Sequence, residues 1–312
     1  MIDIMEQSSR SNNFRVLILE YVTATFGCSE YYNALLLEGF SMAYTLAKLL
    51  NKYVTAHILG SSFLGDVYRS EGDAIRWIDC KTFMDVLPDV AKGYDKVIVI
   101  APPIELVRLA EILGERLWGP SPEYIKILSD KYSSMQILEK CGIEVPRTME
   151  IRNIKDIDFG SIEYPVVIKP CMQAGSECVY MAESPNEAEE YAAKALLCDP
   201  LNRAVIQQYM RGTHSSISAI LGNGKILFYS VNRQLIELKN GVFKYRGNVV
   251  PIRDISIVKN IYGLLTKFVK CYSNLEGYIG FDIVIDGGKP VVVEINPRLT
   301  TSFIAIAKLY PE

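Results

Sequence analysis

The sequence contains very little histidine and has no closely spaced cysteine pairs. Of its 312 residues only His57 and His214 are histidines, which excludes a zinc site with several histidine ligands. The cysteines are odd in number and none stands in a C-x-x-C pair. This usage predicts reduced, mostly buried thiols in a cytoplasmic protein rather than a disulfide framework. The seven are Cys28, Cys80, Cys141, Cys171, Cys178, Cys198 and Cys271.

The sequence also lacks an excess of one charge and any long apolar run. There are 33 Lys and Arg against 36 Asp and Glu, a net charge of −3, which disfavours a nucleic-acid partner. No apolar run approaches the ~18 residues of a membrane span, so no membrane partner is expected. Residues 1–13 are polar and lack the apolar core of a signal peptide. Hydrophobic residues at 49% and charged residues at 22% indicate a globular protein with a sizeable core.

The familiar glycine-rich nucleotide motifs are absent. Neither G-x-x-x-x-G-K-[ST] nor G-x-G-x-x-G occurs anywhere in the chain, so neither a P-loop nor a dinucleotide fingerprint is expected. Any nucleotide site must therefore be built in another way.

Strand and helix patterns alternate in the first third of the chain. Such alternation predicts a small parallel sheet with helical crossovers. The run of breakers over 118–122 marks the first domain boundary. Strands are expected at Val16–Leu19, Val54–Leu59 and Lys96–Ile100, and helices at Tyr31–Leu50 and Ile104–Leu113.

The rest of the chain is antiparallel in character, with a few helices. A helix is expected from Asp130 to Gly142, and another after Ser184, a serine followed by Pro185 and Glu187. The whole chain is therefore of the α/β and α+β class. Further strands are expected at Pro165–Pro170, Cys178–Met181, Ala204–Gln208, Ser216–Leu221, Gly224–Asn232, Val242–Tyr245, Tyr278–Ile285 and Pro290–Asn296, with a helix at Ile257–Tyr272.

The last hairpin carries the strongest chemical signal. Side chains alternate across a strand, so Asp282 can share one surface with Glu294 and Asn296 if the turn Asp286-Gly287-Gly288 pairs the two strands. Two carboxylates and an amide oxygen are the hard donors that Mg²⁺ takes. A solvated sheet face is the favoured alternative for Asp282 alone. The Glu-x-Asn-Pro-Arg run opposite Asp282 favours the metal site over this alternative.

Two lysines could contact phosphate groups. Lys169 ends an apolar strand and precedes the loop Cys171–Glu177, which contains Gly175 and Ser176. Charge and backbone N–H groups together suit phosphate binding, whereas a strand-end lysine on its own is more often a surface residue. Lys131 follows the cap Asp130 and, on its own, is also explained as a surface residue.

The order of these motifs resembles the ATP-grasp superfamily. Asp-Lys at 130–131, Lys-Pro at 169–170, Gln-Gln-Tyr-Met-x-Gly at 207–212 and the acidic hairpin carry the resemblance, which covers roughly residues 118–302. It implies an ATP-grasp fold behind an N-terminal Rossmann-like domain. The implied division is 1–119 for that domain, 120–208 for the central ATP-grasp lid and 209–312 for the C-terminal part with the metal site.

The resemblance also implies a role for each motif residue. ATP and Mg²⁺ are the implied cofactors, with Mn²⁺ as an alternative metal. Arg298 would face the transferring phosphoryl group, and Arg298 and Lys169 are the implied catalytic residues. The implied nucleotide contacts are Lys131, Lys169, Gly175, Ser176, Gln207, Gln208, Met210 and His214, of which His214 stands where a carboxylate is common. The implied metal ligands are Asp282, Glu294 and Asn296.

Within that superfamily the chain looks most like the tyramine–glutamate ligases of methanofuran biosynthesis. The runs at 19–23, 230–234 and 294–302 carry this likeness. It implies a carboxylate–amine ligase that forms an acyl phosphate and joins L-glutamate to tyramine. Small-molecule amino acids and amines would then be the partners, and a homodimer is compatible with it. The implied substrate contacts are Glu20, Tyr21, Arg233, Thr300, Thr301 and Ser302.

Two other functions stay open. The chain could be an ATP-grasp ligase that joins other amino acids or peptides, for example two lysines. It could also bind a nucleotide without ligase turnover, although the complete set of acidic residues and lysines argues against this.

Overall fold

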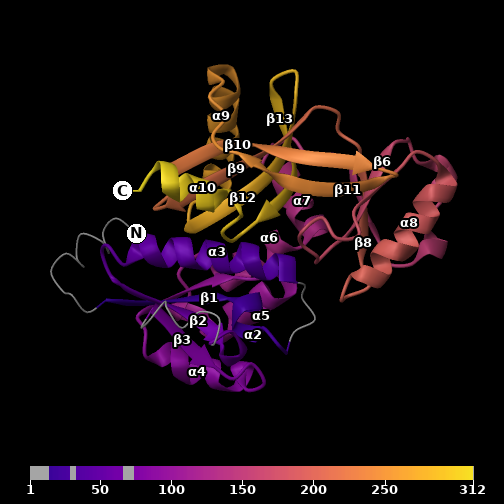
Figure 1. The fold of residues 1–312 in the computed structure, drawn as a ribbon. Helices are drawn as coiled ribbons and strands as arrows, with labels where there is room; N and C mark the ends of the chain where they lie inside the picture. Colours follow the sequence, from indigo (N-terminus) through magenta and orange to yellow (C-terminus); the bar gives the residue numbers. More distant parts are fainter. Residues whose placement is uncertain (1–13, 29–32, 66–73, 312) are drawn as a thin grey trace.

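The computed structural model describes residues 14–28, 33–65 and 74–311, which form two sheets with helices packed on them (Figure 1). The N-terminal sheet has four strands in the order β3-β2-β1-β4, and the second sheet has nine in the order β13-β12-β9-β10-β11-β7-β6-β8-β5. No helix in the described ranges is long and apolar enough to cross a membrane.

The four-stranded sheet is parallel, as the alternation predicts. Its central strand β1 is buried on both faces: Val16 and Ile18 pack with α3, while Leu17 and Leu19 pack with α4 and α5. Burial on both faces is why this strand is an unbroken apolar run. The elements are β1 (Arg15–Glu20), α2 (Tyr21–Thr25), α3 (Asn33–Leu50), β2 (Thr55–Ser61), β3 (Ile75–Ile78), α4 (Phe83–Lys92), β4 (Lys96–Ile100) and α5 (Pro103–Leu113).

The nine-stranded sheet is antiparallel throughout. Its strands are β5 (Thr148–Ile151), β6 (Val166–Pro170), β7 (Tyr180–Ala182), β8 (Ala204–Gln208), β9 (Thr213–Gly222), β10 (Lys225–Lys239), β11 (Val242–Val249), β12 (Gly277–Asp286) and β13 (Lys289–Asn296). Its helices are α6 (Pro122–Ser129), α7 (Lys131–Lys140), α8 (Pro185–Cys198), α9 (Ile255–Cys271) and α10 (Ser302–Leu309). Single 3₁₀ turns lie at 62–64, 114–116, 154–156 and 159–161.

The large sheet consists of two halves joined at a narrow seam between β11 and β7. Val242 and Tyr180 are the one register pair there. Two backbone hydrogen bonds flank it, from Met181 N to Gly241 O (2.7 Å) and from Phe243 N to Val179 O (3.3 Å). Each half has its own core, one beneath α7 and α9 and the other beneath α8. Backbone hydrogen bonds thus run across the whole sheet, but its two halves pack on separate hydrophobic cores.

The expected helix starts and strand pairings are confirmed. Asp130 caps α7 by accepting from Ser133 N (2.8 Å), and Ser184 caps α8 by accepting from Glu187 N (3.4 Å). Strand β7 is the antiparallel mate of β6. Residues 31 and 32 of the first expected helix lie outside the described ranges. The division of the chain at residues 119 and 208 stays a prediction.

The prediction of reduced thiols is wrong for three pairs of cysteines. Disulfides join Cys28 to Cys80, Cys141 to Cys271 and Cys178 to Cys198, and Cys171 is a buried free thiol. The partners are 52, 130 and 20 residues apart. Rules on local spacing miss such pairs because the fold alone brings them together.

Candidate active site

One large cavity gathers most of the residues that the sequence singles out. Its wall is formed by strands from both halves of the large sheet, the loop after β6, the start of α10 and Glu38 of α3. The following predicted residues line it: Lys131, Lys169, Gly175, Ser176, Gln207, Gln208, Met210, His214, Asp282, Glu294, Asn296, Arg298, Thr300, Thr301 and Ser302.

Glu294 of β13 is the residue on which the lysines converge. Its Oε1 lies 3.2 Å from Lys131 Nζ and its Oε2 lies 3.8 Å from Lys169 Nζ. Burial opposes ionisation of this carboxyl, but Lys131, Lys169 and Arg298 outweigh it and hold the pKa of Glu294 below its ordinary value. Glu294 is therefore a carboxylate between two ammonium groups from different elements.

A bulge in β13 explains how Lys169 reaches it. Asp282 pairs with Glu294 and the next residue, Ile283, pairs with Val292, so Val293 has no partner on β12. The freed carbonyl of Val293 accepts from Lys169 Nζ (2.9 Å) and from Gln207 Nε2 (3.4 Å). Burial lowers the pKa of Lys169 to about 8. The bulge thus couples the two halves of the sheet inside the cavity.

Asp282 lies on the same face, as strand alternation predicts. Its Oδ1 accepts from Gln234 Nε2 (2.8 Å) and its Oδ2 accepts from Asn296 Nδ2 (3.3 Å). Burial and the neighbouring Glu294 raise the pKa of Asp282 to about 6, against the opposing effects of Lys169 and Arg298. Two carboxylates of unequal acidity therefore face one cavity.

Arg298 closes this polar group. Its Nη1 donates to Leu299 O (3.0 Å) and its Nη2 donates to Asn296 Oδ1 (3.3 Å). Burial lowers the pKa of the guanidinium, while Glu294 and Asp282 favour the charged form. The hydrogen bonds connect Arg298 to Asn296, which itself donates to Asp282.

These donors suit a magnesium ion that is shared with phosphate groups. The described part of the chain holds no group of three or more His, Cys, Asp or Glu residues placed to bind a metal. Mg²⁺ does not require such a group, because it is commonly bound by one or two carboxylates plus substrate phosphates. Asp282 and Glu294 supply the two carboxylates. The oxygen of Asn296 could join them if it released Arg298.

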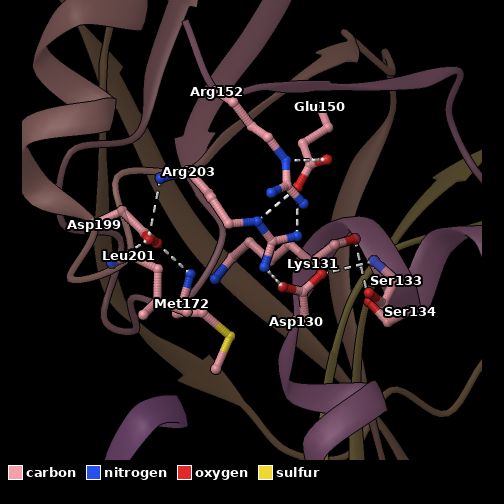
Figure 2. Close-up of polar contacts among 10 residues, drawn as sticks. All are labelled: Asp130, Lys131, Ser133, Ser134, Glu150, Arg152, Met172, Asp199, Leu201 and Arg203. Atoms are coloured by element: carbon pink, nitrogen blue, oxygen red, sulfur yellow. Dashed lines mark hydrogen bonds and ion pairs between the residues drawn. The ribbon is translucent and has the colours of Figure 1, made fainter.

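The turn between α8 and β8 holds Lys131 and the loop after β6 (Figure 2). Arg203 Nη1 donates to Asp130 Oδ2 (2.5 Å), next to Lys131, and its Nε donates to Glu150 Oε1 (2.6 Å). Asp199 accepts from Met172 N (2.6 Å), and Lys131 Nζ donates to Gln173 O (2.5 Å). This turn therefore fixes the entry of the loop beside the lysine.

Three predicted substrate residues, Glu20, Tyr21 and Arg233, are not among the described residues that line the cavity. Glu20 is buried and caps α2, accepting from Val22 N (3.2 Å) and Thr23 N (2.7 Å). Tyr21 packs edge-on against Phe83, and Arg233 is exposed. Their role in substrate binding stays a prediction.

The cavity also contains residues that the motifs do not reveal. Among them are Glu38, Gln173, Gln234, Tyr245 and Asn248. Gln234 of β10 reaches Asp282 of β12 across the intervening strand β9. No local sequence pattern indicates this contact. Glu38 resembles any polar residue on an amphipathic helix.

Comparison with known families decides which fold family holds this site. The profile of the ATP-grasp domain matches residues 128–302. The chain belongs to the ATP-grasp family. The match begins at α6 and ends at the start of α10, so the whole polar surface from Lys131 to Arg298 lies within the ATP-grasp domain.

Two relatives named tyramine–L-glutamate ligase are similar to the chain. The one from Methanocaldococcus jannaschii is 27% identical over 221 residues, covering 69% of this chain and 59% of the relative. The one from Methanocaldococcus fervens is 26% identical over 303 residues, covering 93% and 89%. The match therefore spans less than two thirds of the first relative and most of the second.

Solved structures support the same fold. An ATP-grasp superfamily protein from Archaeoglobus fulgidus superposes with a TM-score of 0.71 at 21% identity, covering 95% of this chain and 84% of that one. The D-alanine–D-alanine ligase from Bacillus anthracis, complexed with ATP, superposes with a TM-score of 0.65 at 19% identity, covering 95% and 92%. At these identities the likeness shows the fold alone, and it confirms the ATP-grasp fold expected from the sequence.

Proposed function

We propose that the protein is an ATP- and Mg²⁺-dependent carboxylate–amine ligase. The observation that carries this is the convergence of Lys131, Lys169 and Arg298 on the carboxylates of Glu294 and Asp282 in one cavity of an ATP-grasp domain. Three cationic side chains suit the triphosphate and the phosphoryl group in transfer, and two acidic side chains suit the metal. No side chain is needed as a covalent nucleophile.

The chemistry depends on placement and charge. In the first step a carboxylate oxygen of the substrate bonds to the terminal phosphorus of ATP, and the bond from that phosphorus to the oxygen of ADP breaks. Lys169 and Arg298 are suited to balance the charge of the three phosphoryl oxygens. In the second step an amine attacks the acyl carbon, releases inorganic phosphate and loses a proton. Mg²⁺ would supply charge neutralisation when held by Asp282, Glu294 and Asn296.

We further propose that the nucleotide lies between the two halves of the large sheet. Gln207, Gln208 and Met210 would contact the base, and Gly175 and Ser176 would lie over the phosphates. His214 packs against Phe243, with 6.3 Å between ring centroids, and burial lowers its pKa. A neutral imidazole can donate one hydrogen bond to ribose, although it lacks the charge of a carboxylate.

The proposed substrates are L-glutamate and tyramine, which would place the protein in methanofuran biosynthesis. The names of the two relatives support this choice. The residues of the cavity support the phosphoryl-transfer step more than they support the identity of the amine substrate. A ligase for other amino acids or peptides remains the alternative within the family.

The test separates the reaction from the substrates. ADP release and hydroxamate formation are measured with ATP, Mg²⁺, hydroxylamine and a broad amino-acid panel. A hydroxamate with at least one carboxylate supports the ligase, since hydroxylamine intercepts an acyl phosphate whatever the natural amine is. If no carboxylate gives hydroxamate, the ligase proposal fails. If L-glutamate does so but tyramine gives no γ-glutamyltyramine, only the acceptor is wrong.

A further inference from the structure

The loop after β6 forms part of the cavity wall and has no regular structure of its own. Residues 173–177 line the cavity, and they lie between β6 and β7, outside any helix or strand. Ser176 and Cys178 have positive φ angles of 60° and 54°. Residues other than glycine rarely adopt such angles, which persist where the surrounding structure holds them. The position of this loop therefore depends on its contacts with other elements.

Asp199, in the turn between α8 and β8, anchors the entry of the loop (Figure 2). Its Oδ2 accepts from Met172 N (2.6 Å), and its Oδ1 accepts from Leu201 N (2.9 Å) and Arg203 N (3.3 Å). The residue is 2% exposed, so these N–H groups replace water around a buried carboxylate. One oxygen thus shapes the turn itself, and the other reaches across to the loop.

Cys198, the residue before Asp199, anchors the other end of the loop. Its sulfur forms the disulfide with Cys178, which directly follows the last loop residue that lines the cavity. Its carbonyl also accepts from Gln173 Nε2 (2.9 Å) near the entry. Two adjacent residues of one turn therefore hold both ends of the loop, and the cavity-lining residues lie between these anchors.

The anchor at the exit can be opened chemically. Cys178 and Cys198 are both half-buried, so a dithiol in solution can reach their bond. Reduction breaks the S–S bond and gives two thiols, while the dithiol loses two electrons and two protons and becomes a disulfide. Cys171 is a poor partner for exchange, because burial raises the pKa of its thiol to about 12 and the thiolate is the reacting form. Reduction thus releases the exit of the loop and leaves its entry intact.

We propose that the turn between α8 and β8 holds the loop after β6 in its nucleotide-binding position, through Asp199 and the Cys178–Cys198 disulfide, and that reduction of this disulfide weakens nucleotide binding. The proposal rests on the nucleotide site proposed above and adds a means of controlling it. The described lining of the cavity includes neither Asp199 nor Cys198, so both act through the loop as positioning residues. A loop that is held in place beforehand loses less conformational entropy when a ligand binds.

Calorimetric titration with a non-hydrolysable ATP analogue tests the entry anchor. We expect Asp199→Ser, whose side chain is one atom shorter and cannot reach Met172 N, to weaken binding by about tenfold or more. In steady-state assays the KM for ATP should rise by a larger factor than kcat falls, because the proposed catalytic residues are unchanged. The matched control is Asp158→Ser, which should bind normally: Asp158 is exposed and accepts from Gly160 N (3.1 Å) in a similar local contact.

The same titration tests the exit anchor. Joint substitution of Cys178 and Cys198 by serine should weaken binding by a similar factor. Joint substitution of Cys141 and Cys271 by serine also removes one disulfide, and it closes the longer loop of the two, yet it should keep the natural affinity. A dithiol should weaken binding to the natural protein and to this control, and it should leave the variant without Cys178 and Cys198 unchanged.

Hydrogen exchange of the loop amides, measured without nucleotide, keeps the two proposals distinguishable. Exchange at Met172 and at residues 173–177 should be faster in Asp199→Ser, and exchange at 173–177 should be faster after reduction. Unchanged exchange, or natural nucleotide affinity in the variants of both anchors, would overturn the anchors and leave the ATP site standing. Faster exchange in a protein that binds no ATP analogue would support the anchors and remove the proposed ATP site.

Discussion

Glu294 lies among several charged side chains of the cavity. It lies between Lys131 and Lys169, which reach it from α7 and β6. Both lysines are buried, so their charges are compensated by this carboxylate rather than by water. Loss of the carboxylate would leave two buried ammonium groups facing each other.

We therefore expect Glu294→Gln to reduce kcat for ADP release by about 10²-fold or more, since it removes a metal ligand and the counter-charge of both lysines. The matched control is Asp286→Asn at the exposed turn of the same hairpin, which should keep full activity. Circular dichroism melting checks that both variants fold. Near-normal turnover of Glu294→Gln at saturating Mg²⁺ would rule out the metal assignment.

Glu20 makes a separate prediction about stability. Burial raises its pKa to about 7 from 4.5, in spite of the hydrogen bonds it accepts at the start of α2. Below pH 4.5 the carboxyl is protonated in both states. Between pH 4.5 and 7 the unfolded chain releases its proton first, so the free energy of unfolding falls as the pH rises, by at most about 3 kcal/mol.

Urea unfolding at pH 5 and pH 8 tests this. The loss of stability between the two pH values should be smaller in Glu20→Gln than in the natural protein, because the amide cannot ionise. The exposed Glu111→Gln should lose as much as the natural protein. An equal loss in all three would mean that Glu20 titrates normally.

At the scale of single residues, the sequence predicts some features of the site and not others. Strand alternation alone predicts that Asp282, Glu294 and Asn296 share a face, and the register bears this out. The meeting of Lys131 with Glu294 spans most of the ATP-grasp domain and depends on packing. The bulge at Val293 has no signal in a run of three valines, yet it provides the carbonyl that holds Lys169.

Among the structural elements, the short strand β8 has a larger role than its length suggests. Its neighbour Arg203 connects three elements: it binds Asp130 at the start of α7 and Glu150 of β5, while its own carbonyl accepts from Cys171 N (3.0 Å) at the end of β6. Its side chain is 17% exposed, and that of Arg152, which binds the same Glu150, is 70% exposed. Because both arginines bind Glu150 but differ in exposure, Arg152 serves as the control for substitutions of Arg203.

We expect Arg203→Met to lower the free energy of unfolding by about 2–4 kcal/mol, because it leaves buried Asp130 without its partner. Arg152→Met should cost at most about 1 kcal/mol, as is usual for an exposed ion pair. Urea unfolding measures both. Equal effects of the two substitutions would show that Arg203 does not hold these elements together.

Elements with a buried apolar run or a clear cap are the easiest to predict. β4 is apolar after its first lysine, β8 begins with Ala-Val-Ile, and α8 has a serine cap followed by proline. β3 and α4 give weaker signals. β3 buries only its first and last residues, so it does not alternate, and α4 contains Pro88. Tertiary contacts determine these two elements more than local sequence does.

For the molecule as a whole, the disulfides contribute stability that the sequence did not predict. Cys141–Cys271 joins α7 to α9 across 130 residues, whereas Cys178–Cys198 closes a loop of 20. Loop-closure entropy gives about 5 kcal/mol for the first and about 3 kcal/mol for the second. The longer link also joins two helices beneath the same core.

We therefore expect the double substitution of Cys141 and Cys271 by serine to lower the midpoint of thermal unfolding more than that of Cys178 and Cys198. A reducing agent should lower the midpoint of the natural protein and have little effect on a variant that lacks all three links. If reduction leaves the natural protein unchanged, the cysteines contribute nothing as links.

The narrow junction between β11 and β7 has a mechanical consequence. A wide antiparallel ladder resists bending because many hydrogen bonds would stretch together, but here the ladder is limited to Val242, Tyr180 and their two flanking hydrogen bonds. The other links across the cavity are side-chain contacts, such as that from Lys169 Nζ to Val293 O. The halves can therefore tilt about this line while each keeps its own ladder and core intact. The cavity spans that line, with Lys169 and Gln207 on one side and Val293 on the other, so a small change of angle alters its width more than its lining.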